Sequence, residues 1–244
     1  MIRTLWYYVV LVASTIVHAT AAVVAGLFRV RSRRGGVYDW ASTDWSRDIL
    51  RAAGTPVIAE GLEHIPPDQP VMYASNHSSM FDIWALFATL PGSVRSVAKQ
   101  ELFRIPLLGG AMRAAGHIAI DRTLKMRAFE AYDDAARTIR RGFSAVVFPE
   151  GTRSRTGDLL PFKNAPFALA IAAQVPVVPV YVHHTFEILP KGRYLLHPRP
   201  IRLLVGQPIP TAGMTADDRD TLRERTRAQI VALKARVDAV PRSS

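Results

Sequence analysis

From residue 54 to residue 205, short runs rich in β-branched residues alternate with segments whose apolar residues recur at helical spacing. This alternation predicts an α/β fold, in which a mixed, largely parallel sheet is flanked by helices and most strands are buried. Strands are expected near residues 56–59, 71–75, 94–98, 117–120, 145–148, 177–182 and 201–205.

Helices are expected between and beside these strands. The apolar spacing predicts them near residues 38–53, 80–89, 124–141 and 162–173. A closing helix follows Thr215 and Asp218, which have the spacing of a capping box, and its apolar stripe consists of Leu222, Ile230, Leu233 and Val237. Pro176 and Pro179 interrupt the run near 177–182, which indicates an edge strand or a bend.

An apolar segment at residues 4–28 precedes this pattern, with His18 as its only group that titrates near neutral pH. A helix of this length can cross a hydrocarbon layer of about 30 Å. A cleavable signal peptide is the competing interpretation, but the segment exceeds the roughly 7–15 apolar residues of a signal core. A spanning helix and a bent or interfacial hairpin both fit. The arginines that follow predict a cell-membrane protein whose bulk lies on the cytoplasmic side: Arg29, Arg31, Arg33 and Arg34.

Charge and cysteine content narrow the possible partners and the possible kinds of site. The 31 Lys and Arg against 20 Asp and Glu give a formal net charge of +11. This excess favours anionic partners such as phosphates, nucleic acid or anionic membrane lipids, without choosing among them. The lack of cysteine excludes thiol nucleophiles, disulfides and thiolate metal sites. We expect a membrane-anchoring segment at 1–34, one domain at 35–240 and a disordered tail at 241–244.

The first candidate site lies where the second predicted strand gives way to a helix, at Asn-His-Ser-Ser-Met-Phe-Asp from residue 76 to 82. On a continuous helix the side chains of His77 and Asp82 would point roughly 140° apart. They can therefore contact each other only if His77 lies in the turn before the helix. Asp82 then reaches back to one imidazole nitrogen while Ser78 or Ser79 caps the helix. The other nitrogen can accept a proton from a substrate hydroxyl. A histidine near a helix start is more often structural, so the pair alone does not decide a function.

A second candidate site follows the predicted strand near 145–148. Gly151 permits an unusual backbone angle, Thr152 and Ser154 offer hydroxyl donors, and Arg153 offers a planar fork suited to a phosphate. The pattern predicts an anion-binding turn, with a plain surface turn as the alternative.

Together these two segments resemble the first and third signature blocks of the lysophosphatidic acid acyltransferases, a glycerolipid acyltransferase family with a His-x4-Asp motif. Two further stretches are similar to the second and fourth blocks, and all four occur in order between about residues 57 and 207. They are Lys99-Gln100-Glu101-Leu102 with Pro106, Gly109, Gly116 and Ile120-Asp121-Arg122, and residues 175–180. One departure is Lys163-Asn164, where many relatives carry a Lys-Lys-Gly run, and it bears on the acceptor headgroup.

The resemblance implies that His77 is the general base and Asp82 its partner. It also implies a set of residues that bind the acceptor's phosphate: Glu150, Gly151, Thr152 and Arg153, with added charge from Lys99 and Arg122. Lys99 and Arg122 each end a predicted strand, where the loops of an open α/β sheet converge on ligands. By resemblance alone, Pro176 and Pro179 lie along the acyl path.

The activity implied is that of a 1-acylglycerol-3-phosphate O-acyltransferase. Such an enzyme moves a fatty acyl group from acyl-CoA or acyl-carrier protein to the sn-2 hydroxyl of lysophosphatidate, giving phosphatidate for phospholipid biosynthesis. The sequence has no GxSxG elbow and no cysteine for a covalent acyl-enzyme. It shows no zinc or calcium spacing either, so neither a metal nor a cofactor is expected.

Other functions stay open at this point. The acceptor could be a lyso-ornithine lipid or glycerol 3-phosphate. The chain could instead be a non-catalytic, basic membrane-binding protein, or a membrane hydrolase in which His77 activates water. Nucleic acid is not an expected partner, because the sequence carries no helix-turn-helix, zinc-finger or aromatic RNA-binding signature.

Overall fold

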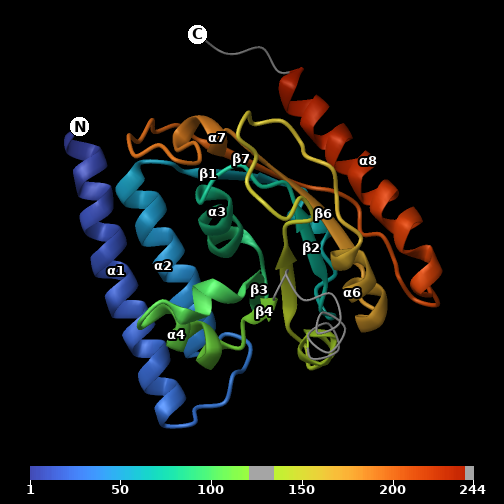
Figure 1. Ribbon diagram of the computed structural model, residues 1–244, viewed down its shortest axis with the longest axis horizontal. Coiled ribbons are helices and arrows are strands. Elements are labelled where there is room, and N and C mark those ends of the chain that lie inside the picture. Colours follow the sequence, from blue (N-terminus) through green and yellow to red (C-terminus); the bar gives the residue numbers. More distant parts are fainter. Residues whose placement is uncertain (121–134, 240–244) are drawn as a thin grey trace.

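The computed structural model describes residues 1–120 and 135–239. A single sheet of seven strands has the spatial order β1-β7-β6-β2-β5-β3-β4. All neighbouring strands are parallel except β6 and β7, which are antiparallel. The α/β class and the seven predicted strands are therefore confirmed (Figure 1). The strands are β1 (Val57–Glu60), β2 (Met72–Ser75), β3 (Val94–Lys99), β4 (Ile118–Ile120), β5 (Ser144–Val147), β6 (Val177–His183) and β7 (Ile201–Val205).

Side chains of the central strands alternate between two cores, as the twofold repeat of a strand requires. In β2, Tyr73 joins the core beside α3 (Phe81–Thr89), whereas Met72 and Ala74 join the core on the other face. Helices α6 (Ala165–Ala173) and α8 (Arg219–Asp238) cover that second face (Figure 1). Both faces of the sheet are thus buried, which explains the nearly continuous apolar runs in the sequence.

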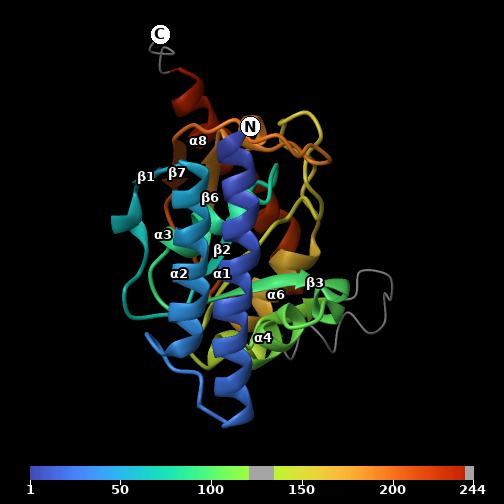
Figure 2. The same cartoon turned by 90° about the vertical axis from the view of Figure 1, so that its left-hand side faces the viewer.

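Two long helices line one edge of the domain. Helices α1 (Ile2–Leu27) and α2 (Val37–Ala53) lie side by side in both views (Figures 1 and 2), and α1 also packs against α4 (Leu108–Ala115). Trp45 Nε1 donates to Thr15 Oγ1 at 2.9 Å, and Tyr38 OH donates to the Val30 carbonyl at 3.0 Å. These pairings make the two helices antiparallel.

The first turns of α1 also reach the core of the domain. Tyr7 is 1% exposed and stacks on Phe81, with ring centroids 5.7 Å apart, and it meets Trp84 edge-on. Leu196 N donates to Thr4 Oγ1 at 3.3 Å. Helix α1 is therefore packed against the domain from its first turn to its last. It is also long and apolar enough to cross a membrane.

The outer side of α1 leaves apolar side chains exposed. Eight large ones are each more than half exposed: Ile2, Leu5, Trp6, Val9, Val12, Ile16, Val17 and Leu27. The boundary expected at residue 34, between an anchoring segment and the domain, stays a prediction.

Helix boundaries and short elements differ from the expectation in several places. Helix α6 begins at Ala165 rather than near residue 162, because Pro166 lacks an N–H and is suited to a first turn. Most of the helix expected at 124–141 lies outside the described residues, although 135–140 are helical. The sequence patterns did not predict α4, nor the following short elements: η1 (Leu62–His64), η2 (Gln100–Arg104), α7 (Thr185–Ile188) and η3 (Ala216–Asp218).

Of the two alternatives for residues 177–182, an edge strand or a bend, the edge strand is wrong, because β6 lies inside the sheet between β2 and β7. Pro179 is tolerated there for a geometric reason. Its carbonyl accepts from Gly206 N at 2.8 Å, so its missing N–H faces the end of β7, beyond the last paired residues Val180 and Val205.

Candidate active site

His77 lies in the turn that follows β2, at the carboxyl end of the parallel strands. The preceding residue fixes this turn to β6: Asn76 Nδ2 donates to the Val182 carbonyl at 2.9 Å, and Val182 N donates to Asn76 Oδ1 at 2.8 Å. The His77 ring stacks on Phe148, with centroids 3.9 Å apart. The imidazole is thus held in place by its own turn and by the loop after β5.

Asp82 is fully buried and collects four donors. Its Oδ2 accepts from His77 Nδ1 at 2.8 Å and from the backbone N–H groups of Ser78 and Ser79 at 2.7 and 2.8 Å. Its Oδ1 accepts from the Thr185 hydroxyl. Because a carboxylate only accepts, His77 carries its proton on Nδ1, and Nε2 is left with a free lone pair.

The start of α3 differs in detail from the expectation. The cap residue is Met80, with no side-chain cap, rather than Ser78 or Ser79. The Asp82 carboxylate itself binds the two serine N–H groups, so it both orders the turn and orients the imidazole.

The buried carboxylate of Glu150 links the two candidate segments by hydrogen bonds. Its carboxylate accepts from His77 N at 3.0 Å and from Leu160 N at 3.3 Å, and the residue is 3% exposed. Burial raises the pKa of Glu150 to about 7, against the opposing effect of these two N–H donors. A second link runs from Ser154 N to the His77 carbonyl at 2.8 Å.

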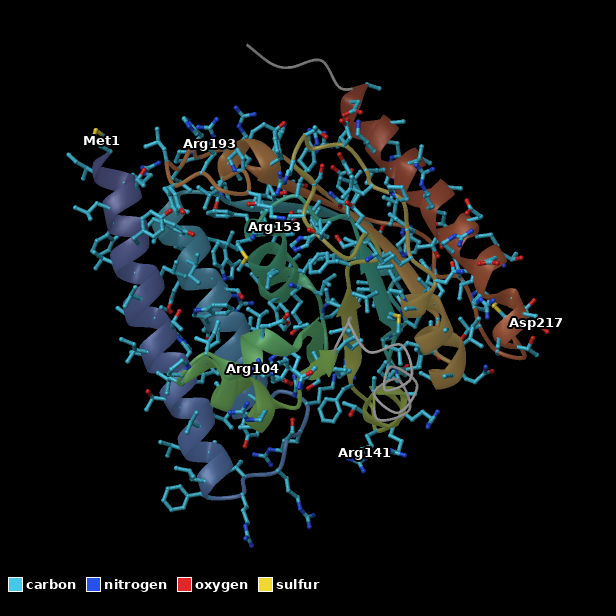
Figure 3. All side chains as sticks on the ribbon, viewed as in Figure 1. Met1, Arg104, Arg141, Arg153, Arg193 and Asp217 are labelled. Carbon is cyan, nitrogen blue, oxygen red and sulfur yellow. The ribbon has the colours of Figure 1, made fainter. Side chains whose placement is uncertain are left out.

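The loop after Glu150 brings polar and basic side chains to the histidine. Gly151 has φ +72°, and the Lys163 side chain covers the position where a Cβ would lie. Thr152 Oγ1 accepts from Lys191 Nζ at 3.3 Å. Arg153 lies on the wall of the cavity beside His77; in Figure 3 it is in the upper half of the view, below Arg193. The hydroxyl of Ser154 is turned inward and accepts from backbone N–H groups of its own loop.

A cavity of about 440 Å³ opens beside His77. Thr152, Arg153 and Lys191 are at its histidine end, and the rest of its wall is mainly apolar. Helices α1, α2, α3 and α4 and strand β3 contribute to that wall. The cavity therefore joins a polar, basic mouth to an apolar interior of the size that small-molecule sites have.

A family model described as "Acyltransferase" matches residues 56–183, more than half of the chain. The chain belongs to the acyltransferase family. The matched range includes the His77 turn, Asp82, and the loop from Glu150 to Ser154, so the resemblance inferred from these blocks is confirmed.

Named relatives of this acyltransferase support the same grouping. It is 37% identical over 177 residues to a human 1-acyl-sn-glycerol-3-phosphate acyltransferase alpha, covering 71% of this chain and 62% of the relative. A 1-acyl-sn-glycerol-3-phosphate acyltransferase of Limnanthes douglasii is 37% identical over 173 residues, covering 70% and 61%. The chain thus spans about three fifths of the length of these relatives.

A solved structure resembles nearly the whole acyltransferase. The crystal structure of the 1-acyl-sn-glycerophosphate (LPA) acyltransferase PlsC from Thermotoga maritima has a TM-score of 0.78 and 26% identity, and the match covers 96% of this chain and 95% of that one. The shared fold therefore includes the N-terminal helices as well as the sheet.

The remaining predicted residues fall in three places. Lys99 ends β3 on the cavity wall, where its Nζ is 3.8 Å from Glu101 Oε1. Arg122 lies outside the described residues. Pro176 and Pro179 are not on the cavity wall, because they lie in or beside β6, away from the strand β3 that lines it.

The sequence patterns missed two residues of this site. Thr185 holds Asp82 from 103 positions away, and Lys191 reaches Thr152 across 39 positions. Each follows β6, whose carboxyl end meets that of β2. Neither belongs to a motif, so only the pairing of strands could have identified them. No group of three or more His, Asp or Glu suited to a metal occurs among residues 1–120 and 135–239.

Proposed function

We propose that this acyltransferase moves a fatty acyl group from acyl-CoA or acyl-carrier protein to the sn-2 hydroxyl of lysophosphatidate, giving phosphatidate. One observation carries the proposal: His77 is oriented by buried Asp82 and keeps Nε2 free beside a cavity with a basic mouth and an apolar interior. The named relatives support the same acceptor.

The chemistry needs one base and no covalent intermediate. The acceptor hydroxyl attacks the thioester carbonyl while His77 Nε2 takes its proton. The tetrahedral intermediate then collapses, the carbon–sulfur bond breaks, and the imidazolium returns the proton to the departing thiolate. Asp82 stabilises the transient imidazolium and fixes the tautomer, as an oriented carboxylate does in other base-assisted acyl transfers.

Substrate binding follows from the two ends of the cavity. Arg153, Lys191 and the Thr152 hydroxyl hold the acceptor's phosphate at the mouth, with Lys99 nearby and with Arg122 as a further candidate. Glu150 is a buried carboxylate, which would repel a phosphate, so it positions the His77 turn instead. The acyl chain lies in the apolar interior.

The membrane holds the enzyme through α1 without being crossed by it. Because α1 packs along the domain over its whole length, a spanning orientation would draw the domain into the hydrocarbon layer. The exposed apolar side of α1 instead lies in the cytoplasmic leaflet of the cell membrane, where the basic chain meets anionic lipids.

The test is transfer of labelled acyl groups in membranes that contain wild-type, His77→Ala or His197→Ala protein. Acyl-CoA and acyl-carrier protein serve as donors, and lysophosphatidate, lyso-ornithine lipid and glycerol 3-phosphate as acceptors. We expect phosphatidate from the wild type, a fall of roughly 10³-fold or more in His77→Ala, and no fall in His197→Ala, whose histidine is exposed. Transfer retained by His77→Ala would remove His77 as the base. Thioester cleavage that needs no acceptor would instead favour a hydrolase.

A further inference from the structure

The interior of the cavity contains polar side chains, and most of them already have partners in the protein. Thr15 Oγ1 donates to the Leu11 carbonyl and accepts from Trp45 Nε1. Ser42 Oγ donates to the Tyr38 carbonyl, and Tyr38 OH donates to the Val30 carbonyl. These groups close hydrogen bonds within α1 and α2 and offer little to a ligand.

His18 on α1 is an exception. It is 8% exposed, lies on the cavity wall, and packs against the Trp40 ring at 4.9 Å between centroids. Its Nδ1 is 2.9 Å from the Ser14 carbonyl, which only accepts, so the proton is on Nδ1 and Nε2 is an acceptor. Within the described part of the chain, Nε2 has no hydrogen-bond partner.

His117, which precedes β4, is the second exception, and its Nε2 is a donor where that of His18 is an acceptor. Its Nδ1 accepts from Ser96 N at 2.9 Å, so the proton is on Nε2, which is a donor. Burial, with the nearby Arg95 charge, lowers the pKa of His117 to about 3, so the ring stays neutral at physiological pH. Among residues 1–120 and 135–239, Nε2 of His117 has no partner either.

Among the described residues, His18 and His117 therefore give the interior of the cavity one unused acceptor and one unused donor in mainly apolar surroundings. An unpaired polar group in such surroundings is costly, and a saturated hydrocarbon chain would leave both unpaired. A hydroxyl group both donates and accepts, so it can bond to either ring. A ketone can only accept, so it can bond to His117 alone.

We infer that the cavity recognises acyl chains that carry a hydroxyl group, which bonds to Nε2 of His18 or His117. The inference rests on the proposed function in one respect, that the acyl chain of the donor occupies this cavity. It adds a specificity that the apolar wall alone does not supply.

The first experiment compares acyl-CoA donors of one chain length, either unsubstituted or with a hydroxyl at successive carbons. At one or two neighbouring positions we expect kcat/KM to exceed that of the unsubstituted donor by roughly 5- to 10-fold, the effect of one net hydrogen bond. A hydroxyl that lowers kcat/KM at every position, or leaves it unchanged, would overturn the inference.

Variants then locate the effect. His18→Asn and His117→Asn keep a group near Nδ1 but lack the outer nitrogen, so at least one should reduce the preference toward 1. His18→Gln, which places an amide at the outer position, should keep more of the preference than His18→Asn. Ser42→Ala is the matched control, because its hydroxyl is used within α2, and it should keep the wild-type ratio. An unchanged ratio in both asparagine variants would contradict the assignment.

Binding without turnover separates this inference from the proposed function. A fluorescent fatty acid bound to His77→Ala protein in micelles is displaced by hydroxylated or unsubstituted fatty acids. We expect the best hydroxylated acid to act at a several-fold lower concentration, and equal potency throughout the series would refute the hydroxyl site. A preference in binding without any transfer by the wild type would refute only the proposed reaction.

Discussion

At the scale of single residues, the site is built from buried carboxylates that bind backbone N–H groups. Asp82 binds two N–H groups and the His77 ring, and Glu150 binds the N–H of His77 itself. Two acidic side chains thus fix the proposed base without contacting its outer nitrogen.

Glu150 should make stability depend on pH. Its pKa is about 7 in the folded protein, above the ordinary value of 4.5, so the folded state binds more protons between these values. Stability contributed by this residue therefore falls as pH rises from about 4.5 to 7. Thermal unfolding of wild type and Glu150→Gln, measured from pH 4.5 to 8, should show the variant gaining on the wild type as pH rises. Glu63→Gln, an exposed control, should not gain, and a constant difference for Glu150→Gln would contradict the prediction.

Arg153 should act mainly on acceptor binding. Replacing it by alanine removes the charge proposed to pair with the acceptor's phosphate, and we expect the KM for lysophosphatidate to rise by roughly 10- to 100-fold with a smaller change in kcat. Arg141→Ala is the control, because Arg141 is exposed, is not on the cavity wall, and lies well away from Arg153 in Figure 3. Initial rates over a range of acceptor concentrations give both constants, and an unchanged KM would argue against a phosphate contact.

At the scale of elements, α1 and α2 form part of the domain. A buried ion pair, Arg95 to Asp39 at 2.8 Å, ties α2 to β3, and Tyr7 ties α1 to α3. Since α3 carries Asp82 in its first turn, the packing of α1 supports the position of Asp82 and of the His77 ring bonded to it.

Tyr7→Ala tests this link. The ring is 1% exposed, so its removal leaves a void beside Phe81 and should cost about 3 kcal/mol of unfolding free energy. Transfer activity should fall with it, because the start of α3 loses a packing partner. Val9→Ala, at a half-exposed position of the same helix, should change stability by about 0.5 kcal/mol or less. Equal losses for both variants, measured by unfolding in micelles, would show that the Tyr7 contact is not special.

At the scale of the whole molecule, the packing of α1 along the domain predicts how the protein would lie on a membrane. Because the chain has no cysteine, single cysteines can report on each end of α1. We expect Arg3→Cys and Arg31→Cys to be protected from an impermeant maleimide in intact cells and to react after lysis. Labelling of Arg3→Cys from outside, with Arg31→Cys protected, would mean that α1 spans the membrane.

The sequence by itself determined the class of fold, the seven strands and the turn chemistry of the motifs. These depend on local patterns: apolar runs, the His77–Asp82 spacing, and the Thr215–Asp218 capping box, in which Thr215 N donates to Asp218 Oδ2 at 2.8 Å. Such local patterns can be recognised in the sequence because residues that are close along the chain contact one another regardless of the tertiary structure.

Only the tertiary structure decided which distant residues share the site. Thr185 and Lys191 reach it because β6 lies beside β2, and Pro179 fits an interior strand because β7 ends there. The same holds for the pairing of α1 with the domain and for the two histidine nitrogens in the cavity that have no partner among residues 1–120 and 135–239. Strand order and helix packing depend on contacts between segments that are far apart in the sequence. No local pattern in this chain predicts those contacts.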